Sequence, residues 1–341
     1  MSPLKIALPS ERQMEEPTLL FMEASGLTVV RPNARAYTGS ISSMPGASVM
    51  FQRTTDMTRN IEEGSIDLAI MGLDRHLEDK VDGGNSVIVL ENLGYAGCEL
   101  VVGVLESWID VMSMSDLADL ALELHASGKH LRIATKYPRL TQSFFIKNGI
   151  NYFEIVAAAG AMEVAPTMGY ADLIVDITST GNTLRENKLK IIKGGTLVKS
   201  EACIIGNIPN LAGDASKLKA TREIIEMIEG RSRAKGYYNV VANLYGKSEA
   251  DVAKKIISKP SASGLQGPTI SRVYSKDGDS NWYSVSVMVP KAKLMEAVDH
   301  LRDVGGKGLA VIPTQYVFEG ESPGYKRLVS QLRPSKNKGK R

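Results

Sequence analysis

The chain has 341 residues, of which 43% are hydrophobic and 23% are charged, so it is long enough to form two or three folded domains. Its 41 basic and 38 acidic residues give a net charge of +3, and its two cysteines exclude both a disulfide framework and a cysteine-rich zinc site. The apolar runs are strand-sized, as at 87–90, and the first ten residues lack the apolar core of a secretion signal. We therefore expect neither a membrane protein nor a secreted mini-protein.

The last eight residues account for the positive balance of the chain. Residues 334–341 carry four basic side chains and no acidic one, so the remainder is close to neutral. Short tracts of Lys, Gly and Pro cannot build a core, and we expect a disordered basic tail there. The positive balance is therefore partly an effect of the tail and does not predict nucleic-acid binding by the folded part, and we expect no nucleic-acid partner.

Short β-rich segments alternate with helical patterns in the first 210 residues. The helical patterns include 13–25 and 54–64. The β-rich segments are 4–9, 49–53, 68–72, 87–91, 99–105, 132–137, 153–158, 173–178, 189–198 and 201–207. This alternation predicts βαβ units with mainly parallel sheets, and the strands are too many for one compact sheet. We therefore expect two α/β lobes.

The pattern changes after a connecting helix predicted at 214–235, which Gly236 can end. The segments that follow are a strand at 238–244, a helix at 248–258, strands at 268–275 and 282–289, a helix at 291–304 and a strand at 309–318. This βαββαβ order is typical of a ferredoxin-like domain, with turn residues at 277–281 between the middle strands. We place this domain at about 236–330.

A hydroxyl-rich loop follows the apolar strand that ends near Asp176. The loop contains Ser179, Thr180, Gly181, Asn182 and Thr183. Glycine allows a tight turn, successive N–H groups can surround an anion, and hydroxyls add donors, so a phosphate monoester fits this chemistry. A loop at the carboxyl end of a parallel strand is also where α/β sheets bind ligands. The residues by themselves leave open an ordinary turn at a strand end.

The same region resembles the signature of the ATP phosphoribosyltransferase family. In this chain the signature comprises Glu163, a Gly-x-Ala-Asp that ends at Asp172, and the run from Asp176 to Leu184. Further matches lie in order at 51–53, 67–74, 97–100, 132–138 and 200–203. The segment 264–271 and the βαββαβ region resemble the long form of the family. The resemblance covers nearly the whole chain up to about residue 325.

The resemblance implies a fold and a reaction. The fold has two periplasmic-binding-protein-like lobes, lobe I at 1–95 plus about 191–229 and lobe II at 96–190, with a C-terminal ferredoxin-like regulatory domain. The reaction, the first step of histidine biosynthesis, joins the phosphoribosyl group of phosphoribosyl pyrophosphate (PRPP) to N1 of ATP and releases pyrophosphate, with Mg²⁺. The resemblance further implies feedback inhibition by histidine, a homo-oligomer (dimer or hexamer) and a cytoplasmic location, or a plastid one if a transit peptide is missing here.

The resemblance also implies roles for individual residues. Glu163 and Asp176 would be catalytic, and Asp176 would help to place Mg²⁺ through the pyrophosphate. The PRPP-binding residues would be Asp172, Asp176, Ser179, Thr180, Gly181, Asn182 and Thr183. The ATP-binding residues would be Arg12, Arg53, Gly72, Asp74 and Tyr137. The histidine-binding residues would be Asn243, Gly267, Thr269 and Ser271.

One loop departs from the family pattern. After the first strand the family usually has Lys-Gly-Arg, whereas this chain has Glu11, Arg12 and Gln13. The charge of the loop falls from +2 to about zero, unless Arg12 substitutes by a shift of one residue. A catalytically altered paralogue therefore stays open as an alternative to the enzyme. The two α/β lobes by themselves also allow a two-lobed small-molecule-binding protein without chemistry.

The residues assigned to ATP have simpler interpretations as well. Arg53 can form a surface ion pair, Asp74 can cap the helix that follows it, and Tyr137 can serve only in packing. These alternatives depend on where the fold places each side chain.

Overall fold

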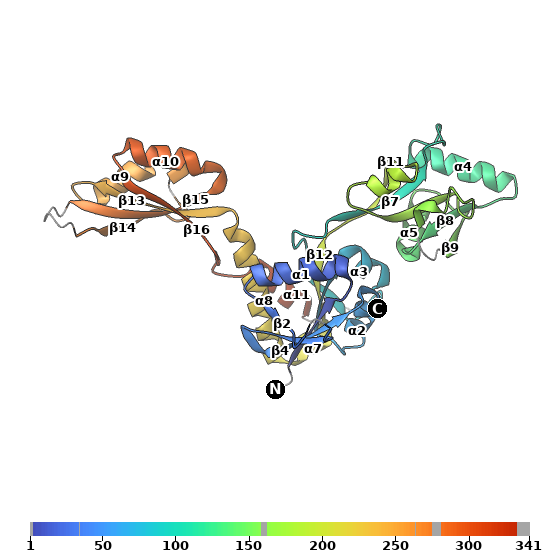
Figure 1. The fold of residues 1–341 in the computed structure, drawn as a ribbon, viewed down its shortest axis with the longest axis horizontal. Helices are drawn as coiled ribbons and strands as arrows, with labels where there is room; N and C mark the ends of the chain where they lie inside the picture. The colour runs from blue at the N-terminus through green and yellow to red at the C-terminus, as the bar shows by residue number, and fades with distance from the viewer. Residues whose placement is uncertain (1–2, 34, 158–161, 263, 275–280, 333–341) are drawn as a thin grey trace, which may run out of the picture. The chain divides into compact units, whose positions relative to one another are not determined.

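The computed structural model describes residues 3–33, 35–157, 162–262, 264–274 and 281–332 (Figure 1). The chain forms two compact units, Met1–Arg222 with Gly324–Arg341 and Glu223–Pro323. The predicted basic tail and all but the last residue of the predicted turn at 277–281 lie outside the described residues.

The first sheet of the larger unit has seven strands in the order β2-β3-β4-β1-β5-β12-β6. Its strands are β1 Leu4–Pro9, β2 Val29–Val30, β3 Thr38–Ile41, β4 Met44–Gln52, β5 Leu68–Gly72, β6 Ser86–Leu90 and β12 Ala202–Asn207. Its helices are α1 Arg12–Ala24, α2 Thr54–Glu62, α3 Leu73–Asp79 and α7 Ile208–Gly213. Strand β1 runs parallel to β4 and β5, so the loops that follow these three strands meet at one edge of the sheet.

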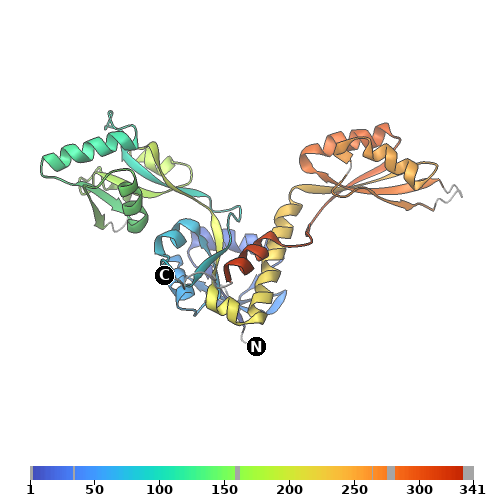
Figure 2. The ribbon, with the colours of Figure 1, turned by 180° about the vertical axis from the view of Figure 1, so that it is seen from behind.

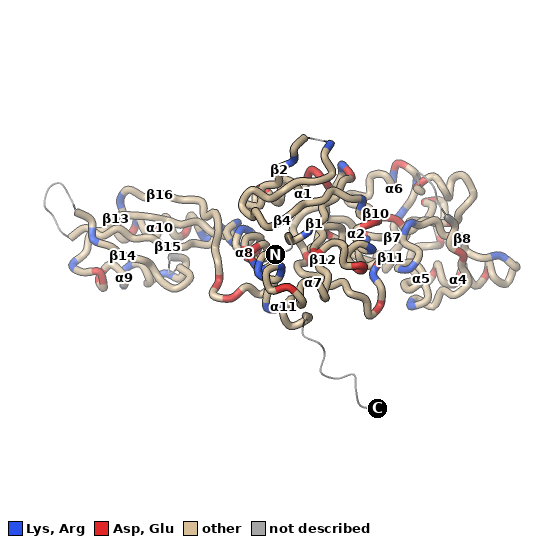
Figure 3. The backbone as a smooth tube through the Cα atoms, turned by 90° about the horizontal axis from the view of Figure 1, so that it is seen from below, with Lys and Arg blue, Asp and Glu red and all other residues tan. Residues whose placement is uncertain are grey.

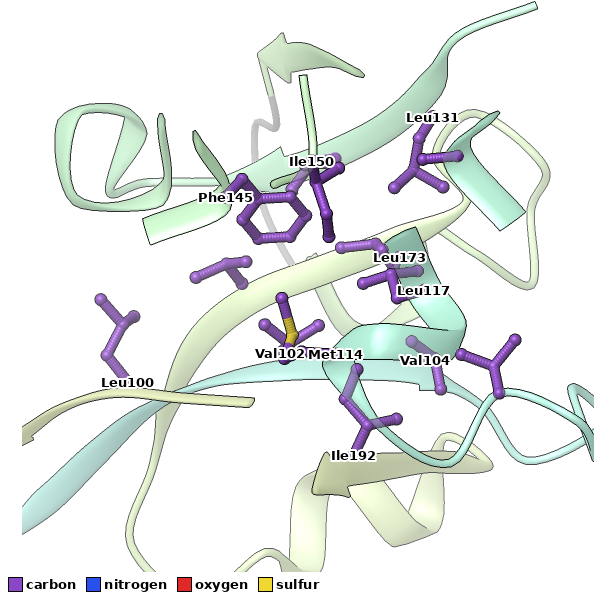
Figure 4. Close-up of a cluster of buried hydrophobic side chains, with 14 of the residues drawn as sticks. Leu100, Val102, Val104, Met114, Leu117, Leu131, Phe145, Ile150, Leu173 and Ile192 are labelled. Atoms are coloured by element: carbon purple, nitrogen blue, oxygen red, sulfur yellow. The ribbon is translucent and has the colours of Figure 1, made fainter. Parts of the chain in front are cut away.

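The second sheet has five strands in the order β11-β7-β10-β8-β9. Its elements are β7 Cys98–Leu105, α4 Met114–Ala126, β8 Leu131–Thr135, α5 Pro138–Lys147, β9 Phe153–Ala157, β10 Leu173–Thr178, α6 Asn182–Glu186 and β11 Leu189–Ser200. Its core gathers Phe145 of α5, Leu117 of α4 and Leu173 of β10, all fully buried (Figure 4). Burial of these side chains on one face fixes the register of the central strands that carry the candidate loop.

The chain passes between the two sheets twice, from β6 to β7 and from β11 to β12. Two α/β lobes joined by two crossing segments are what the periplasmic-binding-protein-like expectation requires, and the predicted fold class is confirmed. Strand β11 stays paired with β7 as far as Ser200. The return to the first sheet therefore lies later than the expected boundary near residue 190.

Helix α8, Ala215–Ala234, runs across the boundary between the two units. In the first half of α8 the guanidinium of Arg222 lies 5.5 Å from the ring centre of Tyr325, which belongs to α11, Pro323–Leu332. The two helices lie side by side (Figure 2). Helix α11 therefore groups with the larger unit, although the sequence placed residues up to 330 in the C-terminal domain.

The smaller unit is built on an antiparallel sheet of four strands in the order β14-β15-β13-β16. Its elements are β13 Tyr237–Tyr245, α9 Glu249–Ile257, β14 Thr269–Arg272, β15 Trp282–Pro290, α10 Leu294–Asp303 and β16 Lys307–Pro313. The predicted βαββαβ order is confirmed. Helices α9 and α10 cover one face, where alternate residues of β13 and β15 are buried (Figure 1). Strand β16 is shorter than predicted because Pro313 has no N–H group to extend the ladder.

Charged residues of both signs are interleaved along the chain (Figure 3). No helix among the described residues has the length and apolar character needed to cross a bilayer.

Candidate functional site

The hydroxyl-rich loop links β10 to the short helix α6. Gly181 has φ of +73°, a left-handed conformation that a side chain would disfavour. Its N–H donates to Oγ1 of Thr178 at 2.9 Å, and the N–H of Asn182 donates to Oγ1 of Thr180 at 3.4 Å. The loop thus supports its own turn, while Ser179, Thr180 and Thr183 remain exposed. Exposed hydroxyls on a turn of this kind are available to a ligand.

Asp176 lies half-buried on β10, just before this loop. Its Oδ1 accepts a hydrogen bond from the N–H of Ile177 at 2.8 Å. Burial raises the pKa of Asp176 to about 6, and the negative charge of nearby Glu163 acts in the same direction. Glu163 lies on a single 3₁₀ turn, Met162–Val164. The pair therefore places two carboxyl groups beside the loop, in surroundings that favour an added cation.

A pocket of about 450 Å³ joins this loop to the edge of the first sheet. Its lining includes Gly72, Asp74, Tyr137, Glu163, Asp176, Ser179, Thr180 and Thr183 from the predicted site. The structure therefore brings together residues that are more than one hundred positions apart in the sequence. Gly181 and Asn182 of the loop are not part of the lining.

Three further residues predicted to bind PRPP or ATP also lie outside this lining. The carboxylate of Asp172 pairs with the guanidinium of Arg132 at 2.7 Å and accepts the N–H of Arg132 at 2.8 Å, so it joins β10 to β8. Arg12 borders a different hollow, lined by α1 itself and its acidic side chains. Arg53 precedes α2 and borders a third hollow on the first sheet. These three residues lie outside the pocket lining, and their contacts with PRPP and ATP, including the replacement of the missing loop cation by Arg12, stay predictions.

Asp74 and Tyr137 form a buried hydrogen-bonded pair. The phenol of Tyr137 donates to Oδ2 of Asp74 at 2.7 Å, and the hydroxyl of Ser200 donates to Oδ1 at 2.6 Å. The N–H of Asp74 in turn donates to the Ser200 hydroxyl at 3.0 Å. Burial and the charge of Asp74 raise the pKa of Tyr137, so the phenol stays protonated. The side chain of Asp74 therefore binds across α3, β11 and the start of α5 instead of capping its own helix.

This pair leads to a stability prediction. Replacing Tyr137 with Phe should lower the free energy of unfolding by about 1–3 kcal/mol, because a buried carboxylate oxygen loses its donor. Chemical denaturation of the purified proteins measures this change. Tyr152→Phe is the matched control, since Tyr152 is partly exposed and stacks on His125. Equal losses in the two variants would contradict the role given to the pair.

The pocket also has residues that the sequence did not single out as contacts, among them Glu11, Thr54, Arg75 and Cys98. Oε1 of Glu11 accepts the N–H of Thr54 at 2.9 Å and its hydroxyl at 3.3 Å. The sequence marked Glu11 as a lost positive charge. It gave no signal that this carboxylate would reach the start of α2, because that contact depends on β1 and β4 lying side by side.

Comparison with protein families identifies the chain. The family model described as ATP phosphoribosyltransferase (HisG) matches residues 53–230, which include the loop and most of the pocket, and the model described as HisG, C-terminal domain, matches residues 234–316. The chain belongs to the ATP phosphoribosyltransferase family. It is an enzyme of the long form, a transferase in the first step of histidine biosynthesis, and the alternative of a binding protein without chemistry is not supported.

Individual relatives agree with this assignment. An ATP phosphoribosyltransferase 2, named chloroplastic, of Arabidopsis thaliana is 37% identical over 96% of this chain and 80% of its own length. An ATP phosphoribosyltransferase of Bradyrhizobium sp. strain ORS 278 is 32% identical over 97% of this chain and 99% of its own length. The solved ATP phosphoribosyltransferase (HisG:HisZ) complex of Thermotoga maritima contains a chain with the same fold over 66% of this chain and 98% of its own, at 23% identity and a TM-score of 0.51.

Proposed function

We propose that the loop of 176–183 binds PRPP in this ATP phosphoribosyltransferase and that the opposite wall of the pocket binds ATP. The observation that carries the proposal is the pocket itself, which unites the exposed hydroxyls of the loop with Gly72, Asp74 and Tyr137. The hydroxyls of Ser179, Thr180 and Thr183 donate to the 5-phosphate, and the turn at Gly181 and Asn182 holds these hydroxyls in place. Asp176 accepts hydrogen bonds from the ribose hydroxyls.

The reaction needs little acid–base chemistry from the chain. The lone pair on adenine N1 attacks C1 of the ribose, the N1–C1 bond forms, and the bond from C1 to the pyrophosphate oxygen breaks with its electron pair. Positive charge develops on the ribose in the transition state. Carboxylates at Asp176 and Glu163 stabilise this charge, and the pocket walls hold the two substrates in line.

Phosphoribosyl transfer generally uses a metal ion, and we propose Mg²⁺ bound to the pyrophosphate of PRPP. The described residues contain no group of three or more His, Cys, Asp or Glu side chains that could hold an ion by themselves. The neighbouring carboxyl groups of Asp176 and Glu163 fit an ion whose other ligands are substrate oxygens, since Mg²⁺ prefers oxygen ligands. When bound, the ion would neutralise charge that develops on the leaving pyrophosphate.

The proposal extends to histidine as a feedback inhibitor bound on the smaller unit. In the antiparallel sheet Asn243 of β13 lies opposite Ser284 of β15, and Ser284 lies opposite Ser271 of β14. These three polar residues therefore form a row across the three strands. Thr269 pairs with Ser286 in a neighbouring row. Alternation places both rows on the face opposite the buried core, and Gly267 begins the approach to β14. A row of hydroxyl and amide groups suits an amino acid.

Exposed hydroxyls make a specific prediction for PRPP. The double variant Thr180→Val, Thr183→Val should raise the KM for PRPP by about tenfold to a hundredfold, because two donors to a charged phosphate are lost. Steady-state kinetics at saturating ATP measures the effect. Thr196→Val on β11 is the control, since it makes the same change outside the pocket lining. An unchanged KM in the double variant would reject the loop as the PRPP site.

Release of pyrophosphate from ATP plus PRPP with Mg²⁺ tests the proposed reaction as a whole. We expect turnover that requires both substrates and falls when histidine is added. Release without PRPP, or no release at all, would contradict the proposal. The same proposal includes a dimer or hexamer in solution, and a location in the cytoplasm or in a plastid, the compartment named for two Arabidopsis relatives.

A further inference from the structure

Glu11 occupies a position at the edge of the pocket where a polyphosphate would need positive charge. It follows β1, whose last residue Pro9 pairs with Gln52 of β4, so the loops after the two strands are neighbours. Oε1 of Glu11 accepts both the N–H and the hydroxyl of Thr54, the first residue of α2. The carboxylate thus accepts hydrogen bonds at the N-terminus of a nine-residue helix, where an anion is favoured.

The second oxygen of the same carboxylate is unsatisfied. Oε2 of Glu11 is buried and has no hydrogen-bond partner among the described residues. A buried charged oxygen without a donor is unfavourable, and a cation beside it removes that cost. Glu11 therefore both blocks an anion and favours a cation at this edge of the pocket.

Within this pocket the rest of the described lining does not compensate for the negative charge, although Glu11 also borders the separate hollow that holds Arg53 and Arg59. Its described lining contains four acidic residues, Glu11, Asp74, Glu163 and Asp176, and one basic residue, Arg75. The guanidinium of Arg75 already makes two hydrogen bonds to the carboxylate of Asp79, at 2.7 and 2.8 Å. Arg12 borders the hollow on α1, and the neighbouring Gln13 is neutral. Two substrates with several phosphates each must enter a pocket of net negative charge.

We propose that Glu11 is a specificity-determining residue that makes the pocket accept polyphosphates only as complexes with a divalent cation. This proposal rests on the proposed function. The described lining offers no basic residue other than Arg75, so the positive charge must come with the substrate. Removal of the Glu11 charge should therefore strengthen binding of the metal-free anion and have little effect on binding of the complex.

Titration calorimetry with inorganic pyrophosphate tests this on the full chain, in EDTA and in saturating Mg²⁺. Glu11→Gln keeps an Oε1 acceptor for Thr54 and removes one charge. We expect Glu11→Gln to bind pyrophosphate about tenfold more tightly than the unmodified enzyme in EDTA, because one negative charge near the anion is removed. A tenfold change in affinity has the same free energy as a shift of about one pKa unit. In Mg²⁺ we expect the difference to fall below about twofold. Glu16→Gln, an exposed change on α1, should match the unmodified enzyme in both conditions.

Each other result overturns the inference. Equal affinity of Glu11→Gln and the unmodified enzyme in EDTA would leave Glu11 as a cap of α2 alone. An increase that is the same with and without Mg²⁺ would show that Glu11 repels anions without selecting the metal complex. If Glu11→Gln unfolds at a lower denaturant concentration than the unmodified enzyme, Glu11→Ala is measured in its place and judged by the same criteria. Turnover separates this failure from failure of the proposed function. If the unmodified enzyme releases pyrophosphate in Mg²⁺ but Glu11→Gln binds metal-free pyrophosphate no more tightly, only the role of Glu11 is contradicted. If the unmodified enzyme neither turns over nor binds pyrophosphate, the role of Glu11 and the proposed function are both contradicted.

Discussion

Replacing Asp176 with Asn should lower kcat/KM for PRPP by about a hundredfold or more. The side chain keeps its size and can still accept the N–H of Ile177, but it no longer carries the negative charge that stabilises the developing charge on ribose. Steady-state kinetics at saturating ATP and Mg²⁺ measures the change. The loss should appear in kcat as well as in KM, because the charge acts mainly in the transition state.

Asp119→Asn is the control for this experiment. Asp119 is an exposed residue on α4 of the same sheet, and its replacement makes the same change of charge away from the pocket. We expect it to leave the kinetics unchanged. An Asp176→Asn enzyme with a kcat/KM within threefold of the control would show that the carboxylate has no part in the reaction.

The rate of the unmodified enzyme should fall below about pH 6. Burial raises the pKa of Asp176 from 3.8 to about 6, so protonation removes the active carboxylate at a pH where an ordinary aspartate remains ionised. We expect kcat/KM for PRPP to drop about tenfold for each pH unit below 6. A profile that stays flat to pH 5 would contradict the assignment of this carboxyl group.

The same shift has a stability consequence of opposite sign. A carboxyl group whose pKa is raised on folding contributes stability below its unfolded pKa of 3.8 and loses that contribution as the pH rises through 6. Asp176→Asn, which stays neutral, should therefore be more stable than the unmodified enzyme at pH 8, on the order of 2 kcal/mol. Below about pH 4 the two proteins should unfold alike. A residue that is kept for function at a cost in stability should give such a variant, which is more stable and less active than the unmodified enzyme.

The sequence predicted most of the fold because its signals are local. Strand runs such as 173–178 and helical periodicity in 214–235 depend on neighbouring residues, and both appear within one or two residues of the expected bounds. The βαββαβ order of the smaller unit followed from the same patterns. The grouping of α11 with the larger unit depends instead on contacts between distant segments, such as Arg222 with Tyr325, which no local pattern encodes.

The sequence also pointed to part of the candidate site, and the roles of its residues stay predictions. The loop from Asp176 to Thr183 stands out by composition, and the structure places its exposed hydroxyls in the pocket lining. Asp172 lies four residues before Asp176 and belongs to the same signature, yet its carboxylate binds Arg132 of the neighbouring strand. The contact between Glu11 and Thr54 joins the starts of α1 and α2, 43 positions apart. Charge alone could not indicate which partner either carboxylate would find.

A crystal structure of the enzyme with PRPP bound in the presence of Mg²⁺ tests the central claim most directly. The account predicts density for the 5-phosphate within hydrogen-bonding distance of the hydroxyls of Thr180 and Thr183, with the ribose beside Asp176. Density for PRPP against α1, against the hollow at Arg53 or on the smaller unit, with the loop of 176–183 left empty, would contradict it.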